Sequence, residues 1–171
     1  MKIALFGGTG FIGTYLIEEL LRMGHTPKVL VRSGSEQKLS HHNKCDIVTG
    51  TIADIGAVRD TISNTDGIIY NIGIIREFPR KKITFEEMHF KGARVCMDMA
   101  SEIGVEKFIL MSANGVKQNG TAYQKTKFLS EQYVKETDLK WTVFRPSLVF
   151  GDPRGKIEFC SQLRDDMLSI P

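Results

Sequence analysis

The sequence predicts an α/β protein built on a doubly wound parallel sheet with helices on both faces. Two observations lead to this fold class. Short apolar segments alternate with amphipathic segments along the chain, which is typical of parallel strands covered on both faces. In addition, the first apolar segment, at 3–6, runs directly into a glycine-rich stretch at 7–13, and an amphipathic segment follows. That order predicts a strand, a tight turn and a helix.

The strands are expected where short segments are apolar without interruption. Such segments are typical of strands that lie in the middle of a sheet and are buried on both sides. In chain order, the expected strands are 3–6, 28–32, 46–48, 67–71, 107–111 and 141–145.

The helices are expected where apolar residues recur every three or four positions. In the first helix Ile12, Leu16 and Leu20 share one face, and Gly24 ends the helix. Asp54 is a suitable N-cap for the second helix. The expected helices are 12–23, 54–63, 85–103, 122–136 and 157–167. This succession favours a Rossmann-type sheet with the strand order 3-2-1-4-5-6.

Composition and charge exclude several classes of protein. A net charge of +3 over 171 residues is too small to indicate a nucleic-acid or membrane-surface partner. We interpret the basic triplet Arg80-Lys81-Lys82 as a solvated loop. The three cysteines lie far apart without metal-ligand spacing, which favours free thiols in a reducing compartment. No apolar run has the length of a membrane span or the form of a signal peptide, so we expect a cytoplasmic protein.

The glycine-rich stretch carries the clearest functional signal. Gly8, Gly10 and Gly13 satisfy the pattern G-x-G-x-x-G, and Gly7, Gly10 and Gly13 satisfy G-x-x-G-x-x-G. The first glycines would let the turn close and let a pyrophosphate contact the main chain, while Gly13 would let the helix pack against the strand. A dinucleotide site is the favoured interpretation, and a plain glycine-rich turn is the alternative.

Residues after the second, third and fourth strands would extend this site along the sheet edge. Arg32 follows the second strand, where an acidic residue would bind the ribose hydroxyls of NAD. An arginine there suits a 2′-phosphate, so NADP is preferred over NAD, although a merely exposed arginine is the alternative. Ile52 would flank the adenine, and Ile72-Gly73 would follow the cofactor backbone; ordinary turn residues remain an alternative for both segments.

Tyr123 and Lys127 lie four positions apart on a predicted helix and therefore share a face. A lysine beside a phenol favours the phenolate and lowers the phenol's pKa, which suits proton transfer to a carbonyl. Taken alone the pair is a common one, but its place after the fifth strand is where a nicotinamide would need an acid. Ser112 ends that strand and would orient the reacting oxygen, or bond the backbone instead.

Other polar and sulfur-containing residues are interpreted as structural. His89 lies on a predicted helix and is expected to be structural rather than a ligand. The methionines are expected to pack in the core. They include Met88, Met97, Met99 and Met111.

Taken together, four motifs resemble those of the short-chain dehydrogenase/reductase superfamily. They are Gly7-Gly-Thr-Gly-Phe-Ile-Gly13, Asn71-Ile-Gly73, Tyr123-x-x-x-Lys127 and Arg145-Pro-Ser-Leu-Val-Phe-Gly151. Three further segments resemble the atypical, extended branch that includes the nucleotide-binding accessory subunit of respiratory complex I and NAD-dependent epimerases. These segments are Met88-His-Phe-Lys-Gly92, Gly104-Val-Glu-Lys-Phe108 and Met111-Ser-Ala-Asn-Gly115.

The resemblance implies a set of cofactor contacts and a catalytic pair. Tyr123 would be the acid/base, and Lys127 would tune it and hold the nicotinamide ribose. The implied cofactor contacts are Gly7, Thr9, Gly10, Phe11, Ile12, Arg32, Ile72, Gly73, Tyr123, Lys127 and Pro146. In active extended members the assisting serine or threonine lies where this chain has Asn114, which is a departure that leaves catalysis open.

Two functions follow as hypotheses. The first is an NAD(P)-dependent oxidoreductase or epimerase acting on a small molecule such as a nucleotide sugar. The second is a non-catalytic protein that binds NADP for structural or redox-sensing purposes and docks a partner. We expect a cofactor-binding domain at 1–151, and at 152–171 the start of a substrate-binding region that is mostly absent. The chain would then be a fragment, or would act as a homo-oligomer or with a protein partner.

Overall fold

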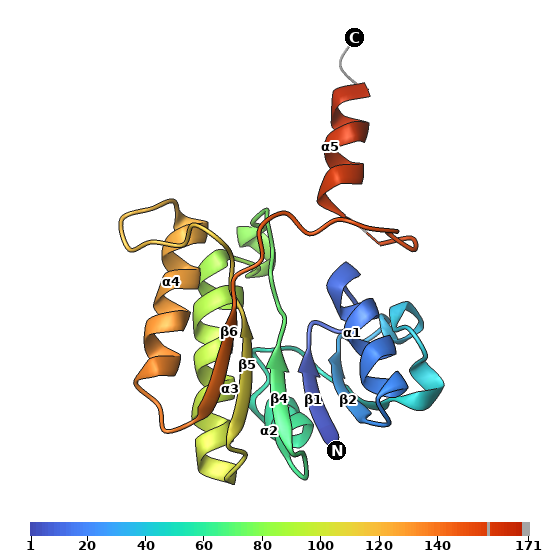
Figure 1. Cartoon of the computed structure of the whole chain (residues 1–171), viewed down its shortest axis with the longest axis vertical. Helices are drawn as coiled ribbons and strands as arrows, with labels where there is room; N and C mark the ends of the chain where they lie inside the picture. The colour runs from blue at the N-terminus through green and yellow to red at the C-terminus, as the bar shows by residue number, and fades with distance from the viewer. Residues whose placement is uncertain (157, 169–171) are drawn as a thin grey trace.

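The computed structural model describes residues 1–156 and 158–168. Within this part of the chain, six parallel strands form one sheet in the order β3-β2-β1-β4-β5-β6, as predicted. The strands are β1 (Lys2–Phe6), β2 (Thr26–Val31), β3 (Asp46–Thr49), β4 (Gly67–Tyr70), β5 (Lys107–Met111) and β6 (Lys140–Phe144). Their carboxyl ends all point to one edge of the sheet, which is the upper edge in Figure 1. From β1 the chain first builds outward through β2 and β3, and then returns to add β4, β5 and β6 on the other side of β1, so the strand order reverses between β1 and β4.

The helices connect these strands within a few residues of the expected positions. They are α1 (Phe11–Arg22), α2 (Ile55–Ile62), α3 (Gly92–Ile103), α4 (Ala122–Lys135) and α5 (Phe159–Leu168). The expected helix at 85–103 begins instead as a π-helix, Glu86–Lys91, before α3 continues it. The expected start of the last helix, residue 157, lies outside the described residues. Among the described residues, no helix combines the length and hydropathy needed to cross a membrane.

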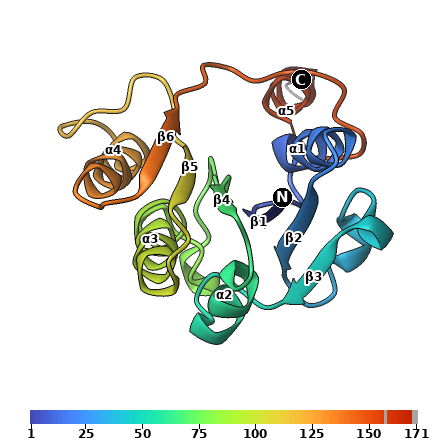
Figure 2. The ribbon, with the colours of Figure 1, turned by 60° about the horizontal axis from the view of Figure 1, so that its bottom comes forward.

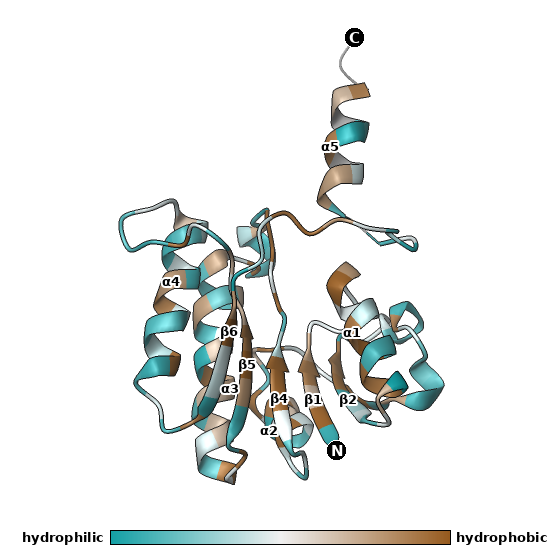
Figure 3. Cartoon of the chain, viewed as in Figure 1, coloured by the Kyte–Doolittle hydropathy of each residue, from teal (hydrophilic) through white to brown (hydrophobic). Residues whose placement is uncertain are grey.

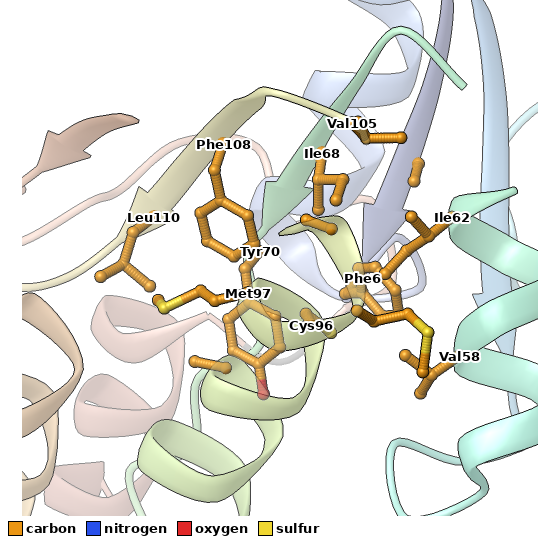
Figure 4. Close-up of a cluster of buried hydrophobic side chains, with 14 of the residues drawn as sticks. Phe6, Val58, Ile62, Ile68, Tyr70, Cys96, Met97, Val105, Phe108 and Leu110 are labelled. Atoms are coloured by element: carbon orange, nitrogen blue, oxygen red, sulfur yellow. The ribbon is translucent and has the colours of Figure 1, made fainter. Parts of the chain in front are cut away.

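The sheet separates two hydrophobic cores of unequal size. Helices α2, α3 and α4 cover one face, and α1 lies on the other (Figure 2). The larger core lies under α2 and α3, around Phe6, Tyr70, Met97 and Phe108 (Figure 4). The smaller core lies under α1 around Ile17. Apolar strands lie inside and polar helix faces outside (Figure 3), which is the pattern on which the sequence prediction rested.

Tyr70 fixes the junction of the π-helix with the sheet. Its side chain is fully buried and its hydroxyl donates to the Met88 carbonyl at 2.6 Å. A Cβ at Gly92 would come within 2.5 Å of that hydroxyl, so only glycine fits there. Burial raises the pKa of the Tyr70 phenol well above its usual value, so this donor stays protonated.

The glycine turn lies in the tightest part of the fold. Gly7 has φ +92°, a conformation that favours glycine, and a Cβ there would come within 2.9 Å of the Asn71 main chain after β4. At Gly13, a Cβ would come within 2.3 Å of the Gly7 carbonyl oxygen. The predicted close packing of α1 on β1 therefore leaves no room for a side chain at Gly13.

We expect Gly13→Ala to lower the free energy of unfolding by about 2 kcal/mol or more, because the clashing atoms are backbone and cannot rotate away. Gly56→Ala in α2 is the control, since its Cβ would meet only the Asp54 carboxylate at 3.4 Å. Urea unfolding of both variants measures the difference. Equal stability of the two variants would contradict the packing argument.

Candidate functional site

A cleft of about 1150 Å³ opens at the carboxyl ends of the strands, where the order reverses between β1 and β4. This is the place where doubly wound sheets bind ligands. The structure brings every candidate site residue into its wall. These residues are Gly7, Thr9, Gly10, Phe11, Ile12, Arg32, Ile52, Ile72, Gly73, Ser112, Asn114, Tyr123, Lys127 and Pro146.

The N-terminus of α1 faces this cleft without a partner of its own. Gly10 is the N-cap and supplies no side-chain hydrogen bond, and the first turn holds no acidic residue. By contrast, α2 is capped by the Asp54 carboxylate and α4 by a capping box between Thr121 and Gln124. The free backbone N–H groups and the positive end of the helix dipole suit a phosphate.

Gly10 differs from its neighbours in the turn. A Cβ at Gly10 would meet only the Gly7 carbonyl, at 3.6 Å, which is ordinary contact. The packing of the fold therefore does not require glycine at this position. A pyrophosphate that approaches the main chain from the cleft would require it, because a side chain at this position would lie in its way. The turn thus fits a dinucleotide.

The charges of the cleft wall are all positive. No aspartate or glutamate lines the cleft in the described part of the chain. Arg32 stands at the end of β2, is exposed, and forms no ion pair with any described residue. An anionic ligand would therefore meet a free guanidinium at this end of the cleft.

Lys127 lies beneath the centre of the cleft. It is 3% exposed, and its Nζ donates to the Met111 carbonyl at 2.7 Å and to the Ile72 carbonyl at 3.4 Å. It therefore ties the end of β5 to the chain that follows β4. Burial lowers the pKa of Lys127 to about 8, and the Glu131 carboxylate one turn further along α4 opposes that shift only in part.

Tyr123 stands one turn before Lys127 on α4, with its ring against those of Phe85 and His89. The ring centroids are 5.7 Å and 5.1 Å apart, and both pairs meet edge to face. From the sequence, we expect Lys127 to lower the pKa of the Tyr123 phenol. In the structure burial raises the pKa of Tyr123 instead, because the ring lies among apolar groups and the ammonium of Lys127 is turned toward backbone carbonyls. The phenol is therefore held in its protonated form, as a donor.

His89 connects the loop after β4 to α4. It is 1% exposed; its Nε2 accepts the N–H of Ile74 at 3.0 Å, and its Nδ1 lies 3.2 Å from the Thr126 hydroxyl. Since Nε2 is the acceptor, we assign the proton to Nδ1, which donates it to Thr126. Burial, and next the charge of Lys127, lower the pKa of His89 to about 3, so the ring is neutral. His89 is therefore structural, as expected, and its ring packs against that of Tyr123.

One polar atom on the cleft wall, Oδ1 of Asn71, is buried without a partner among the described residues. Buried polar atoms are nearly always hydrogen-bonded, so this atom fits a polar ligand in the cleft. Ser112 is 3% exposed, and its hydroxyl lies beside the Glu131 carboxylate. Asn114, which stands where active extended members have serine or threonine, donates its amide to Ser147 Oγ at 3.1 Å.

Behind Ser112, an ion pair between a buried carboxylate and an exposed guanidinium holds α4 to the residue that follows β6. Glu131 has no exposed surface and accepts from Nε and Nη2 of Arg145 at 2.9 Å and 2.5 Å. Burial alone would raise the pKa of Glu131, but the hydrogen bonds from Arg145 and Ser112, together with the charges of Arg145 and Lys135, outweigh it and hold that pKa below the usual value. The carboxylate stays ionised and anchors α4.

Sequence reasoning missed part of the wall. Lys81 and Lys82 are exposed, which agrees with the solvated loop expected from the sequence, but they also line the cleft, which the sequence did not indicate. Met88 and Met111 also line it and are only partly buried, whereas Met97 and Met99 pack in the core as expected. The loop at 74–83 carries no periodic signal, so no local pattern could have found it.

This fold and this cleft are those of a dinucleotide-binding domain. Residues 7–169 match the NAD(P)H-binding family, and the chain belongs to that family.

Similar proteins include both respiratory subunits and reductases. The 40 kDa subunit of mitochondrial NADH-ubiquinone oxidoreductase from Neurospora crassa is 29% identical over 86% of this chain and 40% of that protein. The ceramide reductase of Caulobacter vibrioides is 27% identical over 87% of this chain and 46% of that protein. The chain spans about half the length of the curated relatives it matches.

Solved structures show the same fold. The Bordetella bronchiseptica enzyme WbmH, in complex with NAD+, superposes with a TM-score of 0.80 at 20% identity, over 98% of this chain and 62% of that one. UDP-glucose 4-epimerase from Thermotoga maritima superposes with a TM-score of 0.74 at 22% identity, over 98% and 63%.

The neutral state of His89 predicts a pH dependence of stability. The unfolded chain takes up a proton at this residue near its ordinary pKa of 6.5, whereas the folded chain does so only near pH 3. The free energy of unfolding therefore falls as the pH drops between these values, by up to about 1.4 kcal/mol per pH unit. We expect His89→Gln to have a shallower slope than the wild type in urea unfolding at about pH 7, 5.5 and 4.5.

The control is His42→Gln, which changes an exposed histidine. It should keep the slope of the wild type. A slope in His89→Gln as steep as in the control would mean that His89 is protonated in the folded protein.

Proposed function

We propose that this protein is an NAD(P)-dependent oxidoreductase or epimerase that interconverts a carbonyl and an alcohol in a small molecule such as a nucleotide sugar. The observation that carries this proposal is the convergence of the uncapped α1 N-terminus with Tyr123 and Lys127 on one cleft. The candidate contact residues named from the sequence are proposed as the cofactor contacts. Two findings support this proposal. The chain belongs to the NAD(P)H-binding family, and similar proteins are named as a ceramide reductase and a sterol-4-alpha-carboxylate 3-dehydrogenase.

In this proposal the protein supplies a proton and fixed geometry. The cofactor, when bound, supplies or accepts hydride at its nicotinamide. Tyr123 gives its phenolic proton to the carbonyl oxygen as the alcohol forms, and takes it back in the reverse direction. Lys127, one helical turn away with its ammonium on the carbonyls of Met111 and Ile72, would hold the ribose of the cofactor beside the phenol. Ser112 and Asn114 are the proposed donors that orient the reacting oxygen.

We further propose NADP as the preferred cofactor, with Arg32 as the residue that selects it. The support is its free guanidinium at the end of β2, on a cleft wall without carboxylates. The assignment of 1–151 to the cofactor domain, and of 152–171 to the start of a substrate-binding region, belongs to the same proposal. Phe159 of α5, which lines the cleft, supports it. A cytoplasmic location likewise stays a prediction.

A non-catalytic role is the second candidate. In it the chain would hold the cofactor as a structural or redox-sensing group and dock a protein partner or a second copy. Two observations favour it: Asn114 replaces the expected serine or threonine, and similar proteins are named as subunits of NADH dehydrogenase.

The Arg32 assignment is tested by calorimetric titration with NADPH and with NADH. We expect the wild type to bind NADPH more tightly, and Arg32→Asp to lose about tenfold or more of that affinity while binding NADH at least as well. Arg59→Asp is the control, because Arg59 is an exposed arginine outside the cleft. An unchanged NADPH preference in Arg32→Asp would contradict the assignment.

The catalytic role of Tyr123 is tested by oxidation of NADPH against a panel of carbonyl compounds, including nucleotide 4-ketosugars. We expect Tyr123→Phe to slow turnover by about a hundredfold or more and to leave cofactor affinity within a few-fold. Tyr133→Phe is the matched control on the same helix, since its hydroxyl bonds Asp98 away from the cleft. Full turnover in Tyr123→Phe would rule out the acid/base role. Tight cofactor binding without turnover by the wild type would favour the second candidate.

A further inference from the structure

Part of the cleft lining lies outside the set of candidate cofactor contacts. We call it the outer cleft. It comprises Ile75, Ile83, Leu148 and Phe159, with Lys81 and Lys82. Its loop leads into Phe85, whose ring contacts Tyr123, so it borders the proposed acid. A substrate that places its carbonyl at Tyr123 would extend into this region.

Apolar side chains dominate the outer cleft and are open to solvent. Ile75 is 61% exposed, Leu148 53% and Phe159 44%. Such a surface favours an apolar ligand, because covering it removes apolar area from water. It offers little to a sugar ring, whose hydroxyls need hydrogen-bonding side chains. Apart from the two lysines the outer cleft has none, and nearby Ser147 already accepts from Asn114.

The two lysines are held at this apolar surface by the loop itself. Backbone hydrogen bonds between Phe78 and Ile83, at 2.7 Å and 3.3 Å, close the loop into a short hairpin. Lys82 takes a left-handed conformation with φ +54° at its tip. Glu77, the one carboxylate in the loop, accepts the Phe85 N–H at 2.7 Å. Neither lysine forms an ion pair with any described residue.

We infer that the substrate of this site is an amphipathic anion: a carbonyl or alcohol compound with an alkyl or acyl chain and a phosphate or carboxylate group. The chain would lie on Ile75, Leu148 and Phe159, and the anionic group would pair with Lys81 and Lys82. This inference rests on the proposed function, and it narrows the substrate to a class other than nucleotide sugars. A free cationic pair beside an apolar surface is complementary to both parts of such a molecule.

Calorimetric titration with three probes tests the inference, using the purified protein with and without saturating NADPH. The probes are octyl phosphate below its micelle concentration, butyl phosphate and UDP-glucose. We expect octyl phosphate to bind about tenfold more tightly than butyl phosphate, because its longer chain covers more apolar surface. We also expect it to bind more tightly than UDP-glucose. Equal binding of the two phosphates, or tighter binding of UDP-glucose, would overturn the inference.

Two charge-reversal variants separate the outer cleft from general electrostatics. Lys81→Glu/Lys82→Glu should lose about tenfold of the affinity for octyl phosphate and keep NADPH affinity within twofold. Lys44→Glu/Lys117→Glu makes the same change of charge at two exposed lysines outside the cleft and should keep both affinities. An equal loss in both variants, or a loss of NADPH affinity in the first, would contradict the assignment of the lysines to the substrate.

The same titrations test the proposed function separately from this inference. If NADPH does not bind, but octyl phosphate binds in a lysine-dependent manner, the cofactor proposal fails and the specificity of the outer cleft stands. If NADPH binds and octyl phosphate does not, the cofactor proposal stands and this inference is overturned.

Discussion

The contact between α1 and the turn after β1 is the constraint on which the rest of the site depends. Gly13 leaves no room for a Cβ beside the Gly7 carbonyl, and Gly7 in turn lies against the main chain of Asn71. The turn is therefore held between the first turn of α1 and the end of β4. That position directs the uncapped N-terminus of α1 into the cleft at the point where the strand order reverses. A side chain at Gly7 or Gly13 would displace both the uncapped end of α1 and the adjoining cleft wall.

A second set of contacts holds the cleft wall on the α4 side. It consists of polar side chains that are either neutral or hydrogen-bonded to backbone and to opposite charges. Lys127 donates to a carbonyl after β4 and to one at the end of β5, while His89 connects the loop after β4 to α4. His89 stays neutral because it is buried beside the lysine charge. His89 lies on the π-helix, and its ring meets that of Tyr123 on α4 edge to face. The ion pair of Glu131 with Arg145 then anchors the same helix from behind.

The two walls differ in what they would recognise. On the α1 side, backbone N–H groups and Arg32 suit phosphates. On the α4 side, a protonated phenol and a buried lysine suit a reacting oxygen, and an apolar surface with two free lysines continues beyond them. This division gives the cofactor and the substrate separate determinants. A protein that only stored a cofactor would have no use for the second wall, which is why the proposed catalytic role is preferred to the structural one.

The sequence by itself determined the strand order, the glycine turn and the capping of α2 by Asp54, because each depends on periodicity or on residues adjacent in the chain. It also indicated the fourteen candidate site residues that line the cleft. Only the tertiary structure decided the protonation of Tyr123 and the neutrality of His89, since both follow from burial by segments distant in sequence. It alone brought Lys81 and Lys82 to the cleft, because a loop without periodicity is placed by the hairpin and the packing around it.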